Sequence, residues 1–257
     1  MANSHGNFVW YELMTTDIAA AAKFYSAVTG WGTSDAGHPT MPYTLVHASK
    51  TAVGGMMVLP DEARAQGARP SWIGYIGVDD VDVYAKKVTQ AGGKIHRAAS
   101  DIPQVGRFAV VADPQGAAFV LFKGSPEMHP SENATEKSGH FGWHELMATD
   151  MESAFAFYAS LFGWVKTNAI DMGPMGIYQL FSANGVEIGG MMTKPPALPV
   201  PFWTFYVQVD SIKQAVEKIA AAGGKVVNGP HQVPGGQWIV QGLDPQGAMF
   251  ALVSPVA

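Results

Sequence analysis

The sequence predicts two tandem copies of one α+β domain, each built from two β-α-β-β-β units. The main observation is an internal repeat: residues 10–31 return at 143–164, with eleven of 22 positions identical. Three further blocks recur in the same order, at offsets of 131 to 135 residues: 54–57 at 189–192, 70–95 at 201–226, and 113–119 at 244–250. Repetition on this scale indicates that both halves share one fold.

The first unit of each copy opens with a strand and a helix. Asp17 is expected to cap a helix over 18–29, because its carboxylate can accept hydrogen bonds from the unpaired amides of the first turn. Gly30 is expected to end this helix. The predicted strands of this unit are 8–14, 43–48 and 53–59.

The second unit repeats the order, with a helix over 81–91 that carries an apolar stripe at helical spacing. Its predicted strands are 72–78, 94–97, 107–112 and 117–122. Four such units place helices on one face of each sheet and leave the other face for a polar or water-filled concavity. The expected domains are 1–125 and 140–257, joined by a linker over 126–139, where apolar periodicity is absent.

Composition excludes several classes of function. The chain of 257 residues has a formal net charge of −5 and no run of Lys or Arg, so a nucleic-acid partner is not expected. The chain has no cysteine, which excludes disulfides, thiolate zinc sites and cysteine nucleophiles. There is no apolar run of membrane-spanning length and no secretory pattern in 1–10, so we expect a cytoplasmic protein without a membrane partner.

These motifs resemble the vicinal oxygen chelate superfamily of glyoxalases, bleomycin-resistance proteins and dioxygenases. The resemblance rests on the paired units, the strand–Asp–helix–"FY…GW" opening and the closing "DPQG" turn. Two-domain glyoxalase-like proteins related to lactoylglutathione lyase also have a "GP…VPGG" segment, here 229–236. The resemblance implies an open eight-stranded barrel in each half and no particular reaction, since one fold supports many reactions.

Enzymes of this superfamily commonly hold a divalent metal through His and Glu side chains on four strands. The resemblance places three of these ligand positions in each half, at Trp10 and Trp143, Ile73 and Thr204, and Val120 and Ala251. Near the remaining position, only the second half offers a carboxylate, Glu187. Indole and alkyl side chains cannot coordinate a metal, so no metal cofactor is expected.

The alternative is a divalent-metal site confined to the second half. None of the eight histidines recurs at the matching position of the other copy. His144 and His231, together with Glu145, are the candidate ligands for such an atypical site.

Glu12 and Glu145 recur at one position in both copies, within a W-x-E-L-M strand. Strand alternation places Trp, Glu and Met on one face and the leucine on the opposite, helix-packed face. The glutamate then points into the concavity, and burial against the indole is expected to raise its pKa. That suits a general base or a hydrogen-bonding anchor, so both are candidate catalytic residues. A purely structural glutamate, bonded to a backbone amide or an arginine, is the alternative.

Further aromatic and polar side chains are expected on the same faces. The candidate substrate-binding residues are Trp10, Tyr43 and Tyr75 in the first copy, and Trp143, Tyr178, Thr204, Tyr206 and Gln208 in the second. Together they suit a flat or carbonyl-bearing compound. Ordinary core packing is the alternative for each tyrosine.

The leading hypothesis is therefore a protein that binds a small organic molecule, as a metal-independent enzyme or as a binder. One alternative is a metal-dependent lyase or isomerase of the glyoxalase I type. Another is a resistance protein that sequesters a cationic drug in an acidic cavity. The resemblance also predicts that the two domains pair within one chain, which is a monomer or a homodimer.

Overall fold

The computed structural model describes residues 4–37, 42–125 and 137–257. In the first copy the elements are β1 (Phe8–Thr15), α1 (Ile18–Thr29), β2 (Gly32–Asp35), β3 (Tyr43–Ala48), β4 (Thr51–Val58), α2 (Asp61–Ala65), β5 (Ser71–Gly77), α3 (Val81–Gln90), β6 (Lys94–Ile102), β7 (Gly106–Ala112) and β8 (Ala118–Gly124). In the second copy they are β9 (Phe141–Ala148), α4 (Met151–Phe162), β10 (Val165–Asp171), the short 3-10 turn η1 (Gly173–Met175), β11 (Ile177–Ala183), β12 (Val186–Thr193), β13 (Phe202–Gln208), α5 (Ile212–Ala221), β14 (Lys225–Gln232), β15 (Trp238–Leu243) and β16 (Met249–Ser254).

Each copy forms one eight-stranded mixed sheet. The strand order is β2-β3-β4-β1-β5-β8-β7-β6 in the first copy and β10-β11-β12-β9-β13-β16-β15-β14 in the second. Parallel pairs, such as β1 with β4 and β5 with β8, lie inside antiparallel flanks. The sheet is open in each copy, with edge strands that do not pair with each other among the described residues. The predicted tandem α+β architecture is confirmed.

Local signals in the sequence set the helix ends. The Asp17 carboxylate accepts a hydrogen bond from the backbone amide of Ala20 at 3.0 Å, and Asp150 does the same for Ser153 at 2.8 Å in the second copy. Gly30 then ends α1 in the left-handed region, with a φ of 77° that glycine adopts without a Cβ penalty. The predicted cap and stop of α1 are both present.

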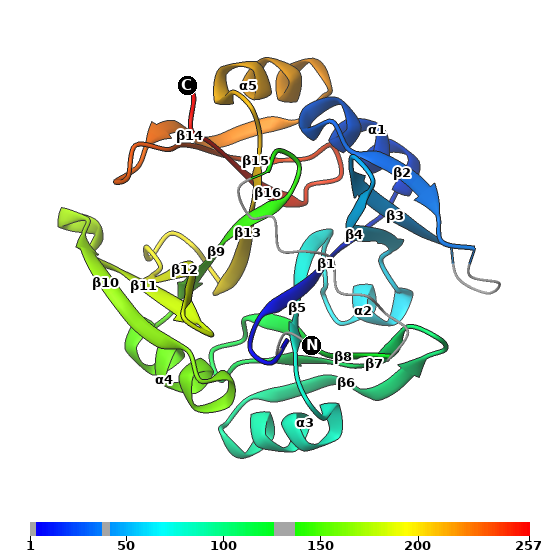
Figure 1. The fold of residues 1–257 in the computed structure, drawn as a ribbon, viewed down its shortest axis with the longest axis vertical. Helices are drawn as coiled ribbons and strands as arrows, with labels where there is room; N and C mark the ends of the chain where they lie inside the picture. The colour runs from blue at the N-terminus through cyan, green and yellow to red at the C-terminus, as the bar shows by residue number, and fades with distance from the viewer. Residues whose placement is uncertain (1–3, 38–41, 126–136) are drawn as a thin grey trace. The chain divides into compact units, whose positions relative to one another are not determined.

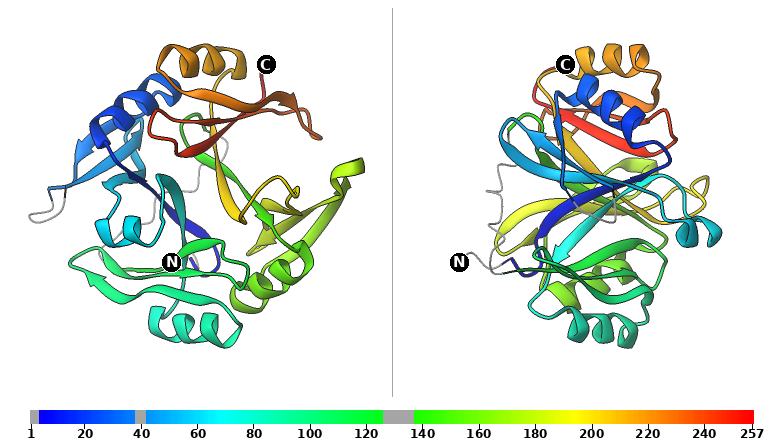
Figure 2. Two further views of the ribbon diagram at one scale, coloured as in Figure 1. Left: turned by 180° about the vertical axis from the view of Figure 1, so that it is seen from behind. Right: turned by 90° about the vertical axis from the view of Figure 1, so that its right-hand side faces the viewer.

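Contacts between residues divide the chain into two compact units, and each unit contains one β-α-β-β-β module from each copy. Unit 1 consists of Met1–Trp10, Ile73–Pro130 and His144–Trp203. Unit 2 consists of Tyr11–Trp72, Ser131–Trp143 and Thr204–Ala257. Helices α3 and α4 therefore belong to unit 1, and α1 and α5, which pack side by side, belong to unit 2 (Figures 1 and 2).

A buried Tyr–Asp hydrogen bond joins residues of the two copies inside unit 2. The Tyr25 hydroxyl of α1 donates to Oδ2 of Asp244, in the DPQG turn of the second copy, at 3.1 Å. The indole N–H of Trp72 donates to the Tyr25 oxygen at 2.8 Å. Oδ1 of Asp244 accepts from the backbone amides of Gln246 and Ala248, both at 2.9 Å. Burial raises the pKa of the Asp244 carboxyl, because these bonds only partly offset its loss of solvent.

Unit 1 contains the same network with the roles of the copies exchanged. The Tyr158 hydroxyl of α4 donates to Oδ2 of Asp113 at 3.1 Å, and Trp203 donates to the Tyr158 oxygen at 3.0 Å. Burial likewise raises the pKa of Asp113. Each helix tyrosine thus depends on the turn aspartate of the other copy.

Some elements differ from the sequence-based expectation. Strand β2 was not predicted, because all of its residues are exposed and show no apolar alternation. Strand β6 continues to Ile102 instead of ending at Arg97, since its largely exposed residues give little periodic signal. Residues 126–136 of the expected linker lie outside the described residues, and the boundaries at 125 and 140 stay a prediction. Within the described part of the chain, no helix is long and apolar enough to cross a membrane.

Candidate functional site

Glu12 lies on the partly exposed face of β1, as alternation predicts. Leu13 and Thr15 on the opposite face are fully buried, whereas Trp10 and Met14, which share the face of Glu12, are half-buried. Glu12 itself is 8% exposed. A carboxylate on a face of otherwise apolar, incompletely buried side chains is the arrangement expected of a ligand-binding surface.

The Tyr43 ring lies on the same face as Glu12, because a glycine makes room for it. Glu12 of β1 is the register partner of Gly55 in β4, so both residues point to one face of this parallel pair. A Cβ added to Gly55 would overlap the hydroxyl end of Tyr43. The phenol therefore occupies the space beside the glutamate that any other residue at position 55 would fill.

The second copy builds the same arrangement from the matching residues. Glu145 of β9 is the register partner of Gly190 in β12, and a Cβ on Gly190 would overlap the ring of Tyr178. Glu145 is 8% exposed, the same fraction as Glu12, and the burial patterns of β9 and β1 are identical. A carboxylate, a phenol and a bare glycine thus recur together in both copies.

Strand β13 of the second copy presents buried polar groups. Thr204, Tyr206 and Gln208 alternate on one face and are all at least nine-tenths buried. Among the described residues, the Thr204 hydroxyl has no hydrogen-bond partner. Trp143 packs against the cluster formed by Tyr206 and its neighbours on β16. The Gln208 backbone bonds the segment that leads into β9, donating to the His140 carbonyl at 2.8 Å.

A chain of side-chain amides holds the Tyr206 oxygen. Gln241 Nε2 donates to the Tyr206 hydroxyl oxygen at 2.7 Å, and Asn228 Nδ2 donates to Gln241 Oε1 at 3.1 Å. The Asn228 Oδ1 lies 3.1 Å from Nε2 of the exposed His231. Sequence reasoning missed Gln241 and Asn228. The signal was present, however, because Gln241 interrupts an apolar strand where the first copy has Val110.

The matching strand of the first copy is apolar. Ile73 stands at the position of Thr204, and Tyr75 packs edge-on against Phe122 with ring centroids 5.7 Å apart. Tyr75 is the register partner of Val120, as Tyr206 is of Ala251. The two copies thus share the glutamate and both tyrosine positions and differ in the polarity of this strand.

The candidate metal ligands are not gathered into one site. His144 alternates with Glu145 on β9 and therefore faces the opposite side, where it stacks on Phe8 with centroids 4.1 Å apart. Its Nδ1 lies 2.5 Å from the Ile188 carbonyl, and burial lowers its pKa to about 4. His144 is thus neutral at physiological pH and part of a packed core. His231 is exposed and bonded to Asn228.

The residues at the superfamily's metal positions do not fit a metal. Ile73, Val120 and Ala251 are buried alkyl groups that lack a donor atom. Glu187 is exposed, and its Oε2 accepts from the Thr167 hydroxyl at 2.6 Å. In the part of the chain that the structure describes, no three His, Cys, Asp or Glu side chains form a group that could hold a metal ion.

Comparisons with known proteins agree with the fold. The model of the Glyoxalase/Bleomycin resistance protein/Dioxygenase superfamily matches residues 7–121 and 137–252. Over 250 residues the chain is 35% identical to "Putative glyoxylase CFP32" of Mycobacterium tuberculosis, covering 96% of this chain and 94% of that protein. Over 264 residues it is 29% identical to "Anthracycline biosynthesis protein DnrV" of Streptomyces peucetius, covering 95% and 91%.

Solved structures of low sequence identity share the architecture. The Mn(II)-bound glyoxalase from Novosphingobium aromaticivorans superposes with a TM-score of 0.65 at 15% identity, covering 98% of this chain and 83% of that one. The 2,2',3-trihydroxybiphenyl 1,2-dioxygenase from Sphingomonas wittichii RW1 gives 0.65 at 13% identity, with 96% and 89% covered. At such identities the likeness shows the fold alone.

Proposed function

The chain belongs to the glyoxalase/bleomycin resistance protein/dioxygenase superfamily, and from this we propose that each copy binds its own small, flat, oxygen-bearing organic molecule, through Glu12 in the first copy and Glu145 in the second. In each copy the ligand lies on the helix-free face of the strand that carries the glutamate, β1 or β9, and donates a hydrogen bond to its carboxylate. Binding in this proposal uses no metal at the positions where the superfamily commonly holds one.

One observation carries the proposal: the Glu–Tyr–Gly arrangement recurs in both copies. Glu12 with Tyr43 over Gly55, and Glu145 with Tyr178 over Gly190, come from three strands each, at the same register. Both carboxylates are at least nine-tenths buried, on a strand face that also carries a half-buried tryptophan. The recurrence of carboxylate, phenol and glycine at one register position in both copies supports a shared ligand contact.

The chemistry of these groups defines the ligand class. An ionised carboxylate only accepts hydrogen bonds, so the ligand must offer a hydroxyl, an amine or a cationic group. The tyrosine ring and the half-buried Trp10 or Trp143 favour a planar ring system. The name of the relative DnrV, an anthracycline biosynthesis protein, supports a hydroxylated polycyclic ligand of this kind.

The metal-independent part of the proposal rests on the donor set. A metal-dependent lyase of the glyoxalase type needs several His or Glu ligands on neighbouring strands, and the alkyl side chains of Ile73, Val120 and Ala251 supply none. The remaining chemistry available is acid–base: a glutamate that accepts a proton, and tyrosine hydroxyls that donate hydrogen bonds.

Titration with 1,2-dihydroxyanthraquinone, followed by a thermal-shift screen of related hydroxylated and carbonyl-bearing aromatics, tests the proposal. A ligand that binds only the folded state raises the melting temperature. For each hit, Glu12→Gln and Glu145→Gln should retain the parent's melting temperature and weaken calorimetric affinity by roughly 1–3 kcal/mol, the cost of losing a charged hydrogen-bond partner. Variants that melt far below the parent and bind unchanged would show that the glutamates are structural.

A second assay distinguishes the proposed metal-independent binding from the alternative of a metal-dependent glyoxalase. The hemithioacetal of methylglyoxal and glutathione is offered with and without added Ni²⁺ or Zn²⁺. Turnover that appears only with metal, and is lost in Glu145→Gln, would replace the proposal with a metal-dependent lyase.

A further inference from the structure

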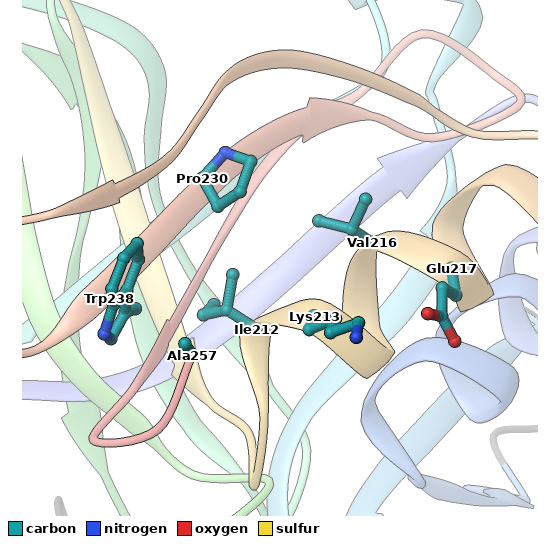
Figure 3. A pocket seen from close by; sticks show the side chains of 7 residues that line it. All are labelled: Ile212, Lys213, Val216, Glu217, Pro230, Trp238 and Ala257. Carbon is teal, nitrogen blue, oxygen red and sulfur yellow. The ribbon is translucent and has the colours of Figure 1, made fainter.

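A cleft lies between helix α5 and the β14–β15 hairpin in the second copy, on the helix-covered side of the sheet. Its volume is about 350 Å³. Figure 3 shows Trp238 and Pro230 from the hairpin on one side, and Ile212 and Val216 from α5 on the other. Lys213 and Glu217 lie along the helix at its rim. The cleft is thus an apolar slot with charged groups on one edge.

The first copy has an ion-pair network at the same place. At the repeat offset of 131, Asp82 corresponds to Lys213 and Arg107 to Trp238. Strand register confirms the match, because Arg107 pairs with Asp101 as Trp238 pairs with Gln232.

The Arg107 guanidinium ties the helix to the hairpin in the first copy. Arg107 Nε lies 2.7 Å from Asp82 Oδ2, its NH2 group 2.9 Å from Oδ1, and its NH1 group 2.9 Å from Asp101. This fork-on-carboxylate geometry is specific as well as favourable. This ion pair joins α3 to β7 in the first copy. In the second copy, lysine replaces the aspartate and tryptophan replaces the arginine.

Lys213 and Trp238 do not form the ion pair that their counterparts Asp82 and Arg107 form in the first copy. No ion pair or cation–π contact among the described residues involves Lys213 or Trp238. Figure 3 places Trp238 and Lys213 on opposite sides of the apolar slot.

We propose that this cleft binds a planar aromatic anion of one or two fused rings, with its carboxylate on Lys213 and its ring against Trp238. The volume lies at the small end of the range for ligand sites, roughly 300–1,000 Å³, which limits the size of the ring system. Stacking on indole favours a flat ring, and the ammonium group supplies the charge that an anion requires. Glu217, one helical turn beyond Lys213, disfavours a second negative charge on the ligand.

This site is independent of the proposed function. Alternation along β15 places Trp238 on the helix side and Ile239 and Gln241 on the opposite face. The glutamate faces carry carboxylates that repel an anion, whereas the cleft offers Lys213. The two sites therefore select ligands of opposite character.

Calorimetric titration of the full chain with 2-naphthoate tests the proposal, with the neutral 2-naphthylmethanol as the matched control. We expect one naphthoate per chain and binding of the alcohol that is weaker by about tenfold, the value of one charged hydrogen bond. Equal binding of the two compounds, or naphthoate binding that does not saturate at one per chain, overturns the proposal.

The first copy supplies the decisive variant. Lys213→Asp combined with Trp238→Arg rebuilds the Arg–Asp pair of the first copy, and should abolish naphthoate binding while the melting temperature stays at or above that of the parent. Lys213→Ala, a change of one exposed side chain, should weaken binding about tenfold without affecting the fold. Glu217→Gln should tighten it. Unchanged naphthoate affinity in Lys213→Ala overturns the proposal, as does weaker binding in Glu217→Gln.

Discussion

The hydroxyl of Tyr25 donates to Asp244 at 3.1 Å across 219 positions of the sequence, and Tyr158 donates to Asp113 at the same distance. In both cases a tryptophan N–H donates to the tyrosine oxygen. A residue that both accepts and donates inside a dry core fixes its neighbours strongly, because each lost bond leaves a buried polar group.

Removing either tyrosine hydroxyl should destabilise the protein. Tyr25→Phe and Tyr158→Phe each leave a buried carboxylate and a tryptophan N–H short of one partner, so each should lower the free energy of unfolding by about 1–3 kcal/mol. Urea unfolding measures the change. Tyr84→Phe is the control, because its hydroxyl bonds the partly buried His5 ring at 3.2 Å and not a buried carboxylate. A loss no larger than the control's would show that the network is dispensable.

The two buried aspartates should make stability depend on pH in an unusual direction. Burial raises the pKa of Asp113 and of Asp244 in the folded state above the unfolded value. The folded protein then binds protons more readily, so this contribution is greatest at low pH and is lost as pH rises through the folded pKa. Relative to Asp113→Asn or Asp244→Asn, the parent should therefore gain stability as pH falls from neutral through the folded pKa towards the unfolded value of 3.8. A relative loss on acidification contradicts the expectation.

His144 should act in the opposite direction. Its folded pKa of about 4 lies below the ordinary value of 6.5, so the unfolded chain binds the extra proton between these pH values. Its contribution should fall by roughly 3 kcal/mol as pH drops from 7 to 4, at 1.36 kcal/mol for each pKa unit. His144→Asn keeps a donor for the Ile188 carbonyl and does not titrate, so the parent and this variant should converge in stability at low pH. Parallel pH profiles in urea unfolding would contradict this.

Adjacent glycines provide a paired test of the glutamate site. A Cβ at Gly55 or Gly190 would meet the far end of a tyrosine side chain and not backbone, so Gly55→Ala and Gly190→Ala should displace the ring and weaken binding of the proposed ligand with little loss of stability. A Cβ at Gly54 lies 2.7 Å from the Tyr11 carbonyl oxygen, which is backbone. Gly54→Ala should therefore cost stability, by about 1–3 kcal/mol for overpacking. Thermal melts and calorimetry measure the two effects, and the reverse pattern would contradict the assignment.

Divalent metals should not bind stoichiometrically. Calorimetric titration of metal-free protein with Mn²⁺, Ni²⁺ or Zn²⁺ is expected to give no site of one metal per copy, because Ile73, Val120 and Ala251 offer no donor atoms. Stoichiometric binding that is lost in Glu145→Gln would contradict this expectation.

The repeat and the strand alternation were sufficient to predict the architecture and the face on which Glu12 lies. The glutamate's neighbour was harder to predict. The Gly-Gly-Met-Met block was recognised as a repeat, but only the register of β1 with β4 shows that Gly55 makes room for Tyr43. The placement of Glu12, Tyr43 and Gly55 depends on how three strands are aligned, and this register cannot be derived from a single sequence.

The partnership between copies was also beyond the sequence. A repeat shows that Asp113 and Asp244 are equivalent, yet not which tyrosine each one accepts from. The sequence shows that Trp238 stands where the first copy has Arg107. The resulting loss of an ion pair cannot be predicted from that position alone, because it also depends on Asp82 and Lys213, which lie 25 residues earlier in each copy.

In the two Tyr–Asp pairs, the tyrosine of each copy donates to the aspartate of the other, so each copy needs the other to complete its hydrogen bonds. Both copies carry the same tyrosine, tryptophan and aspartate, so recombination that replaced the second copy with a duplicate of the first would preserve every donor and acceptor of the two networks. Deleting either copy would instead strand a tyrosine in what remains. The surfaces proposed to bind ligands lie outside these two networks, so each copy can change its ligand-facing residues while the Tyr–Asp hydrogen bonds between the copies stay the same.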